Sequence, residues 1–257
     1  MRKRYFFFDI DGTLAAGPVM GRYIPESTKR ALELLRRQGH FLAICTGRSH
    51  AMGEGFMDEL GFSNMVSDGG NGLTIDGEFL GVKPLERQGC IDVIEECERL
   101  GVVWAISTDD SRRRYTRCAN YDELVHDTYM ETIVDPNLDY RQAAQFNKVY
   151  VLCSEREEAR IQSLARVPKA RFSPYSLFVE PVDKGEGIKR CMAQLGASVE
   201  DVVVFGDGSN DVSMFLSEWT SIAMGNAIDE LKALANYVTT DVDHDGIWNA
   251  CKHFQWI

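Results

Sequence analysis

The sequence predicts an α/β fold built on a doubly wound parallel sheet, because short apolar runs alternate along the chain with segments of helical periodicity. The apolar runs are continuous and do not alternate with polar residues, which is typical of strands covered on both faces. Gly, Asp or Asn bounds each run. The predicted strands lie at residues 5–10, 41–46, 202–207, 221–225 and 237–240.

Two helices are predicted from apolar spacing and a terminal glycine. The segment 26–39 places Ala31, Leu34 and Leu35 on one face and ends on glycine, as amphipathic helices with a glycine cap do. The segment 184–196 also ends on glycine and has helical character. Helices that alternate with strands in this way favour a parallel sheet, since parallel strands need long crossover connections.

The middle of the chain has elements of its own and is predicted to form an inserted α+β domain. It follows a hairpin that is expected to turn at Asp76–Gly77, and it contains a helix that begins at Ser154, where Glu157 completes a capping box. A further helix is predicted at residues 86–101, with strands at 102–107, 113–119, 147–153 and 176–182. We therefore expect a core domain at residues 1–82 and 182–257 and an inserted domain at residues 83–181.

Composition narrows the possible partners. The chain of 257 residues has a formal net charge of -11, which argues against nucleic acid or an anionic membrane as the main partner. The seven cysteines form no CxxC pair and the five histidines lack the short spacings of zinc ligands, so we expect reduced thiols. The apolar run before Asp9 is too short for a signal peptide, and no later run could span a bilayer. We expect a soluble, cytoplasmic protein, and the sequence does not predict its oligomeric state.

Two carboxylates stand at the end of the first predicted strand. Because side chains along a strand alternate with a period of two, Asp9 and Asp11 are expected to point the same way and to share one small space. Like charges held close require a cation or a shared proton, so the pair indicates a divalent metal site or an acid/base couple. The alternative is that Asp11–Gly12 is only a turn signal after a strand.

Two further loops could bind an anion. Thr46 and Gly47 follow the second predicted strand, where a hydroxyl and close backbone N–H groups could hold an oxyanion; otherwise this is a polar loop with Arg48 in solvent. Lys184 stands at a predicted helix start, where a cation is unfavourable unless an anion or carboxylate accompanies it. The alternative is a solvated lysine paired with Asp183 or Glu186.

A third carboxylate follows another buried strand. Asp207 is placed to join Asp9 and Asp11 in an oxygen-rich site suited to Mg²⁺. The next residues, Ser209, Asn210 and Asp211, open a predicted helix, and the alternative is that one of them is simply its N-cap. The carboxyl ends of strands in an open parallel sheet form the ligand-binding rim, so all four clusters are expected to converge there.

In motif content the chain resembles the haloacid dehalogenase-like superfamily and, within it, the Cof-type phosphatases with a large α/β cap of type IIB. The matching motifs occur in order along most of the chain: DIDGTL, TGR, GGNG (69–72), DKGEGI, GDGSNDVSMF, AMGNA (223–227) and DHDGIW (243–248). The resemblance implies a Rossmann-like catalytic core and a cap that determines substrate specificity. Asp183 departs from the small residue that many relatives have before the motif lysine, and its charge could hold Lys184 in place or weaken phosphate binding.

The resemblance also implies roles for the site residues. Asp9 would be the nucleophile that forms an aspartyl-phosphate, and Asp11 would protonate the leaving alcohol and then activate water. Mg²⁺ would be held by Asp9, by Asp207 and by the backbone carbonyl of Asp11, with Asp211 bound directly or through water. The residues that would bind phosphate oxygens are Thr46, Gly47, Lys184 and Asn210.

The implied activity is Mg²⁺-dependent hydrolysis of small phosphomonoesters, most plausibly sugar phosphates. The alternatives are a phosphomutase on the same scaffold and a non-enzymatic module that is phosphorylated or binds a metabolite. Carbon–halogen hydrolysis is disfavoured because a halide needs no proton from Asp11. The inserted domain concentrates four arginines, Arg112, Arg113, Arg114 and Arg117. They could recognise a second anionic group on the substrate, but we expect a solvated strand or turn there.

Overall fold

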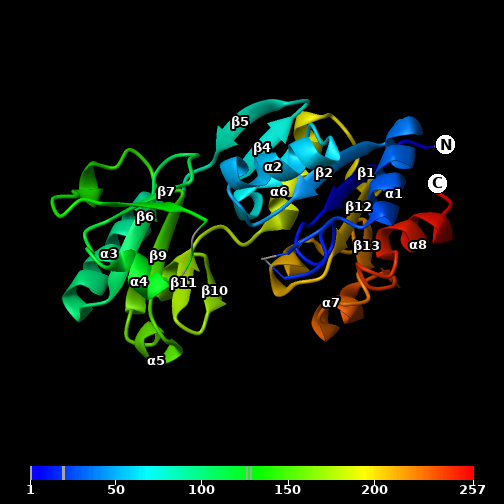
Figure 1. Cartoon of the computed structure of the whole chain (residues 1–257). Coiled ribbons are helices and arrows are strands. Elements are labelled where there is room, and N and C mark those ends of the chain that lie inside the picture. The colour runs from blue at the N-terminus through cyan, green and yellow to red at the C-terminus, as the bar shows by residue number, and fades with distance from the viewer. Residues whose placement is uncertain (1, 19–20, 126, 128) are drawn as a thin grey trace. The chain divides into compact units, whose positions relative to one another are not determined.

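The computed structural model describes residues 2–18, 21–125, 127 and 129–257, and the chain divides into two compact units (Figure 1). The core unit comprises Met1–Gly81 and Asp183–Ile257, and the inserted unit comprises Val82–Val182. None of the helices in the described residues is long and apolar enough to cross a membrane.

Within the described residues, the core unit contains an eight-stranded sheet in the order β14-β13-β12-β1-β2-β3-β4-β5. The strands from β14 to β3 run parallel to one another, whereas β4 pairs antiparallel with β3. The predicted parallel sheet is therefore confirmed and extended by an antiparallel edge. The strands span Tyr5–Phe8 (β1), Phe41–Cys45 (β2), Met65–Ser67 (β3), Gly72–Ile75 (β4), Glu78–Val82 (β5), Val202–Gly206 (β12), Thr220–Ala223 (β13) and Tyr237–Val238 (β14).

The turn between β4 and β5 explains why the sheet ends in a hairpin on this side. Asp76 and Gly77 both have positive φ, 50° and 82°, as the two central residues of a type I′ hairpin turn require. Asp and Gly are the residues that tolerate this conformation at consecutive positions. The predicted turn lies where the sequence places it.

The central strand β1 is buried from both faces. Phe6 and Phe8 join a cluster with α1, α2 and α8, whereas Phe7 joins a cluster with α6 and α7 on the other face. All three rings are fully buried, which is why this strand reads as a continuous apolar run. Figure 1 shows α1 and α8 side by side, although they come from opposite ends of the chain. The helices span Glu26–Arg37 (α1), His50–Leu60 (α2), Lys184–Gln194 (α6), Asp229–Leu234 (α7) and Gly246–His253 (α8).

One detail of the first predicted helix is wrong. The buried residues of α1 are Thr28, Ala31, Leu32 and Leu35, so Leu32 takes the place that was predicted for Leu34. This set follows the i, i+3, i+4, i+7 spacing of a single helix face. Leu34 lies at the margin of that face.

The inserted unit contains a six-stranded sheet, counted over the described residues, in the order β10-β11-β9-β6-β7-β8. Its α3 helix and a short 3-10 helix at Gln162–Arg166 pack against β6, β9 and β11 in one apolar cluster. The capping box at Ser154 and Glu157 is confirmed, although α5 itself is only one turn long. The elements span Arg87–Leu100 (α3), Tyr121–Val125 (α4), Glu155–Glu158 (α5), Val103–Ser107 (β6), Arg113–Thr116 (β7), Glu131–Val134 (β8), Lys148–Leu152 (β9), Lys169–Ser173 (β10) and Ser176–Val179 (β11).

Candidate active site

Three of the predicted site residues follow the carboxyl ends of neighbouring parallel strands. Asp9 comes directly after β1, Thr46 after β2 and Asp207 after β12, and β1 lies between the other two strands. The backbone N–H of Asp9 donates to the carbonyl of Phe205 at 3.0 Å, which continues the sheet ladder. Asp9 is only 5% exposed. The carboxyl ends of the three strands thus place these residues at neighbouring positions.

Lys184 is buried among these carboxylates. Its side chain is 1% exposed, and its Nζ donates to Asp9 Oδ1 and Asp211 Oδ1, both at 2.6 Å. Burial alone would lower the pKa of Lys184, but the two carboxylates outweigh it and raise the pKa above its ordinary value. The alternative of a solvated lysine paired with Asp183 or Glu186 is therefore wrong.

Asp183 has a separate structural role. It is the N-cap of α6, and its Oδ1 accepts a hydrogen bond from the Glu186 backbone N–H at 2.8 Å. An N-cap carboxylate satisfies one of the free donors of a helix terminus and complements its dipole. The backbone N–H of Lys184 donates to Ser213 Oγ at 3.0 Å. These two contacts fix the helix start from which the lysine side chain extends.

Asp211 ties the lysine to the Asp207 loop. It is fully buried, and its Oδ2 accepts hydrogen bonds from the backbone N–H groups of Asp207, at 2.8 Å, and Gly208, at 3.0 Å. It lies on a 3-10 helix, Ser209–Met214, which begins where Ser209, Asn210 and Asp211 were predicted to open a helix. Both carboxylate oxygens of Asp211 already accept hydrogen bonds from protein donors, so Asp211 is suited to hold Lys184 and the Asp207 loop in position.

Asp207 faces the turn that follows β1. Its Oδ1 accepts a hydrogen bond from Thr13 Oγ1 at 2.8 Å. A Cβ at Gly12 would lie 2.1 Å from Asp207 Oδ2, and Gly12 has φ +84°. Glycine is thus required at position 12 both for the backbone conformation and for the approach of the carboxylate.

Asp9, Asp207 and Asp211 carry more negative charge than the protein compensates. One carboxylate oxygen from each lies within 4.8 Å of the others, and one ammonium, that of Lys184, pairs with two of them. Burial, with repulsion from Asp211, raises the pKa of Asp9 to about 7 against the pull of Lys184. Burial likewise raises the pKa of Asp207 to about 7, although Thr13 opposes it. Three carboxylates facing one ammonium leave two uncompensated charges when ionised, which suits a hard divalent cation.

The side chain of Asp11 is not one of these three, although its charge contributes to the raised pKa of Asp207. The expectation that Asp9 and Asp11 share one small space stays a prediction; the contacts of the Asp11 carboxylate are with two arginines. Arg48 Nε and Nη2 both donate to Asp11 Oδ2, at 3.1 and 2.9 Å, and Arg22 Nη2 forms an ion pair with Oδ1. The strand ends at Phe8, so the two-residue alternation of a strand does not extend to Asp11.

The predicted phosphate-binding residues lie at the same end of the sheet, beside the carboxyl ends of the parallel strands. Thr46 is buried and its Oγ1 accepts a hydrogen bond from the Arg48 backbone N–H at 3.1 Å. Gly47 and Asn210 are neighbours, because a Cβ at Gly47 would lie 3.8 Å from Asn210 Nδ2. With Lys184, all four residues belong to the core unit: Thr46 and Gly47 follow β2, Lys184 begins α6 and Asn210 lies on the 3-10 helix Ser209–Met214.

Sequence reasoning missed several residues that support the site. Asn226 Nδ2 donates to the carbonyl of Gly12 at 2.9 Å, and Asn226 Oδ1 accepts from the Val242 backbone N–H at 2.8 Å. Its AMGNA motif was noted, but no role could be read from it. Ser213 and Arg22 gave no local signal, since their partners lie far away in the sequence.

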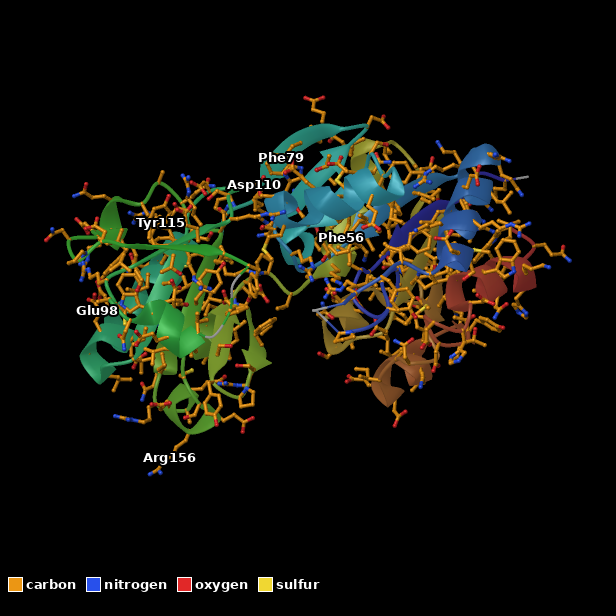
Figure 2. All side chains as sticks on the ribbon, in the orientation of Figure 1. Phe56, Phe79, Glu98, Asp110, Tyr115 and Arg156 are labelled. Carbon is orange, nitrogen blue, oxygen red and sulfur yellow. The ribbon has the colours of Figure 1, made fainter. Side chains whose placement is uncertain are left out.

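The arginines predicted as a solvated strand in the inserted unit are largely paired. Arg114 is fully buried and pairs with Asp127 and Asp122, so a solvated position is wrong for this residue. Arg113 pairs with Glu131 at 2.9 Å, and Arg117 pairs with Glu98 at 2.6 Å (Glu98 is labelled in Figure 2). These three arginines therefore serve contacts within their own unit.

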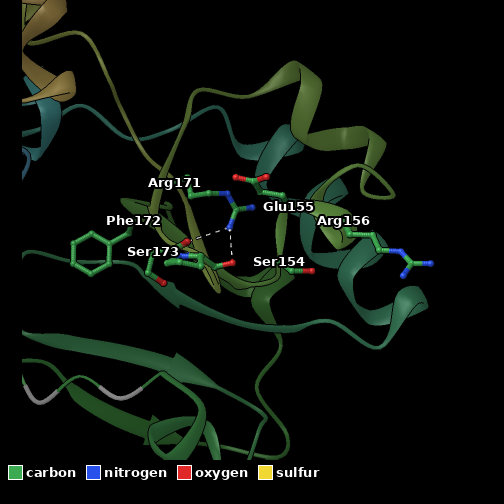
Figure 3. Close-up of a pocket in the computed structure, with 7 residues that line it drawn as sticks. Ser154, Glu155, Arg156, Arg171, Phe172 and Ser173 are labelled. Carbon is green, nitrogen blue, oxygen red and sulfur yellow. Dashed lines mark hydrogen bonds between the residues drawn. The ribbon is translucent and has the colours of Figure 1, made fainter. Parts of the chain in front are cut away.

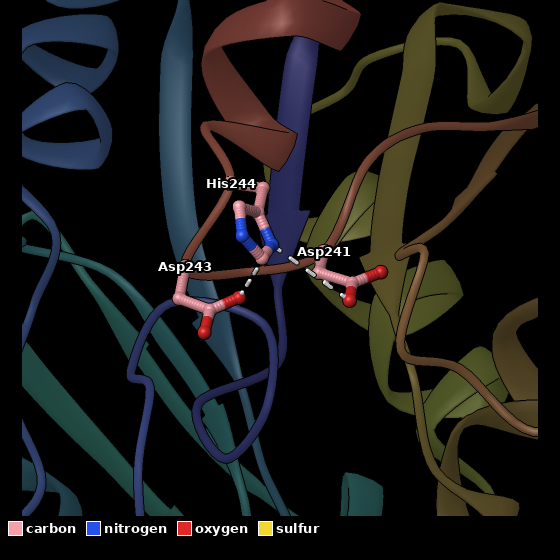
Figure 4. A group of neighbouring side chains, drawn as sticks. All are labelled: Asp241, Asp243 and His244. Carbon is pink, nitrogen blue, oxygen red and sulfur yellow. Dashed lines mark ion pairs between the residues drawn. The ribbon is translucent and has the colours of Figure 1, made fainter.

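Two other polar groups stand outside this site. Figure 3 shows an open pocket of the inserted unit, in which the Arg171 guanidinium is already bound to the carbonyls of Cys153, at 2.9 Å, and Ser173, at 3.2 Å. Figure 4 shows His244 beside Asp243 and Asp241 in the turn before α8, at 3.1 and 3.9 Å. His244 is largely exposed, so water solvates this cluster.

Comparison with known proteins agrees with this geometry. The family model of the haloacid dehalogenase-like hydrolases matches residues 6–251. The chain belongs to this family. Among relatives of the hydrolase, YkrA from Bacillus subtilis (strain 168) is 28% identical over 256 residues and covers 98% of both chains. A phosphoglycolate phosphatase from Nitrosopumilus maritimus (strain SCM1) is 27% identical over 256 residues, covering 97% of this chain and 95% of its own.

Solved structures extend the likeness to the whole fold. A protein from Geobacillus kaustophilus HTA426 superposes on the hydrolase with a TM-score of 0.85 at 31% identity, covering 100% of both chains. The subclass IIB sugar phosphatase BT4131 gives a TM-score of 0.80 at 26% identity, covering 99% of this chain and 100% of its own. The predicted superfamily and its Rossmann-like α/β core with a cap are confirmed, and the comparisons support a phosphatase.

Proposed function

We propose that this hydrolase is a Mg²⁺-dependent phosphatase of small phosphorylated metabolites, in the first place sugar phosphates, and that it acts through an aspartyl-phosphate intermediate. The observation that carries the proposal is the buried Asp9 carboxylate held by Lys184 at 2.6 Å beside Asp207 and Asp211. A carboxylate nucleophile must be held in one orientation beside groups that neutralise the transferring phosphoryl group. The likeness to the sugar phosphatase BT4131 supports the substrate class.

The donor set fits a magnesium ion. Asp9 and Asp207 would supply carboxylate oxygens, the backbone carbonyl of Asp11 a third ligand, and Asp211 an outer contact, since its oxygens already serve Lys184 and two backbone N–H groups. When bound, Mg²⁺ supplies positive charge that offsets the phosphoryl oxygens and the carboxylates. The uncompensated negative charge of Asp9, Asp207 and Asp211 supports the proposal that Mg²⁺ binds there.

The residues of the chain divide the chemistry between them. Asp9 attacks phosphorus, so that a new O–P bond forms on its carboxylate while the ester O–P bond breaks. Asp11 donates a proton to the leaving alcohol and then removes a proton from the water that attacks the aspartyl-phosphate. Lys184, Asn210, Thr46 and Gly47 hold the phosphoryl oxygens, and water releases inorganic phosphate and regenerates Asp9.

Phosphate release from an aryl phosphate and then from a panel of phosphorylated metabolites tests the proposal. We expect release with Mg²⁺, none with a chelator, and restoration on adding Mg²⁺ back. Turnover that does not depend on a metal, or undiminished turnover of Asp9→Asn, would contradict the mechanism. Conversion of a substrate into its isomer without net phosphate release would indicate a phosphomutase.

A further inference from the structure

Arg22 and Arg48 reach the same carboxylate from two different loops. Arg22 precedes Tyr23, which pairs with Ala16 in an isolated bridge, and Arg48 follows the Thr46–Gly47 loop. Arg48 bonds Asp11 through Nε and Nη2, and Arg22 adds an ion pair from its own Nη2. Both contacts lie within the core unit.

Both guanidinium groups are held in place by a shared aromatic ring. The Cζ atoms of Arg22 and Arg48 lie 5.8 and 5.5 Å from the ring centroid of Phe56 on α2, which Figure 2 labels. The backbone of Arg48 is fixed as well, because its carbonyl accepts a hydrogen bond from Asp68 N–H at 2.8 Å. Stacking on an aromatic face orients a guanidinium without consuming its donors. The two arginines are thus preorganised.

The charge at this point is not balanced. Among the described residues, Asp11 is the carboxylate with which both arginines form ion pairs, so two positive charges face one negative charge. The side chain of Asp11 is 46% exposed, whereas those of Arg22 and Arg48 are 15% and 23% exposed. A partly buried pair of guanidiniums with surplus charge is suited to a further anion, which it can bind through bidentate hydrogen bonds.

We propose that Arg22 and Arg48 form a subsite for a second anionic group of the substrate, a carboxylate or a second phosphate carried by the leaving alcohol. The inference rests on the proposed function. In that function Asp11 must reach the ester oxygen to protonate it, so the arginines that bind Asp11 lie beside the organic group that is bonded to this oxygen. The preferred substrates are then phosphomonoesters of acidic alcohols, such as phosphorylated hydroxy acids and sugar acids, or bisphosphates.

A matched pair of substrates tests this subsite. Phosphoglycolate and 2-hydroxyethyl phosphate differ in one group, a carboxylate in place of a CH₂OH. We expect wild-type kcat/KM to favour phosphoglycolate at least about tenfold, as charge-assisted hydrogen bonds allow. Arg22→Gln should remove most of this preference through KM, and Arg22→Lys should retain part of it. Arg30→Gln is the control, since Arg30 stacks on Trp248 in the same way and forms no contact with Asp11.

Binding to an Asp9→Asn protein gives a second measurement that needs no turnover. Calorimetric titration should show tighter binding of phosphoglycolate than of 2-hydroxyethyl phosphate, and adding Arg22→Gln or Arg48→Gln should abolish the difference. Equal binding of the two compounds, or an equal loss for both in the arginine variants, would overturn the subsite and leave the arginines as positioning residues for Asp11. A binding preference without phosphate release from any substrate would support the subsite and contradict the proposed phosphatase.

Discussion

In each unit of this hydrolase a buried cation pairs with two carboxylates, and the two groups differ in the charge that they leave uncompensated. In the core unit, Lys184 is 1% exposed and pairs with Asp9 and Asp211. In the inserted unit, Arg114 is fully buried and pairs with Asp127 and Asp122. Burial and ion pairing alone therefore do not distinguish a reactive group from a structural one.

The surroundings make the distinction. Arg114 also donates to Thr132 Oγ1 at 2.8 Å and lies 4.8 Å from the ring centroid of Tyr121, and its partner Asp122 is largely exposed to water. The positive charge of Arg114 is thus compensated, and its N–H donors have partners, within the inserted unit. Around Lys184 a third carboxylate, Asp207, adds negative charge that no side chain of this cluster neutralises. Residual charge in a buried group is what favours a ligand.

Replacing the two cations should separate catalysis from stability. Lys184→Met removes the cation that orients Asp9 and faces the phosphoryl oxygens, so we expect kcat/KM for phosphate release to fall about 10³-fold or more. Arg114→Met should leave kcat of the folded protein within about threefold of wild type, because its contacts stay within the inserted unit. Near-normal turnover by Lys184→Met would contradict the distinction.

The stability of the inserted unit should depend strongly on Arg114. Arg114→Met leaves the nearly buried Asp127 without its partner, and we expect a loss of about 3–5 kcal/mol in the free energy of unfolding. Urea denaturation followed by tryptophan fluorescence, to which Trp104, a buried residue of this unit, contributes, measures it. The matched control is Arg113→Met, whose pair with Glu131 is exposed on both sides and should cost less than about 1 kcal/mol. Equal losses would show that burial of the pair is unimportant.

The acidic cluster should make metal-free protein less stable as pH rises. The pKa values of Asp9 and Asp207 are raised to about 7 from an ordinary value of 3.8, so between about pH 4 and 7 the folded state binds more protons than the unfolded state. The free energy of unfolding should then fall over this range by about 2 kcal/mol or more. Thermal unfolding at several pH values, in chelator, measures it.

Two controls identify the source of that pH dependence. Saturating Mg²⁺ should stabilise the ionised carboxylates and raise the midpoint most at the upper end of the pH range. Asp207→Asn should flatten the slope in chelator. A slope unchanged by both would assign the effect to other groups.

Substitutions at the start of α6, the helix that carries Lys184, should have the smallest effect on stability and on phosphate binding. Asp183→Ala removes the N-cap of α6 and should cost about 1 kcal/mol, whereas Asp183→Asn retains a capping oxygen and should be close to neutral. Phosphate affinity should follow the same order if Asp183 acts only through the helix. Equal strengthening of phosphate binding by both variants would show that the negative charge of Asp183 acts on the phosphate directly.

Local sequence patterns were sufficient to predict the sheet and most of the candidate site. Continuous apolar runs identified strands covered on both faces, and the polar residue at the end of each run, such as Asp9 or Asp207, marked the carboxyl end of the parallel strands, where sheets of this kind bind ligands. The capping box at Ser154 and the turn at Asp76 follow from short-range chemistry. These features depend on residues close together in the sequence.

The errors concern partners that only the tertiary structure brings together. The ion pairs of Asp11 were not predicted, because Arg22 and Arg48 come from other loops. The burial of Arg114 depends on Asp127, beyond the next helix. Periodicity gives the face of an element on which a residue lies, but it does not give what covers that face.

Trapping the phosphorylated enzyme tests the central claim most directly, namely that Asp9 forms the covalent bond and Asp11 moves the protons. Asp11→Asn should still react with an aryl phosphate, whose leaving group needs no proton, and should then hydrolyse the aspartyl-phosphate slowly. Acid quenching, borohydride reduction and peptide mass mapping should find close to one modified residue per chain, at Asp9. Normal multiple turnover by Asp11→Asn, or a modification at any other residue, would contradict the account.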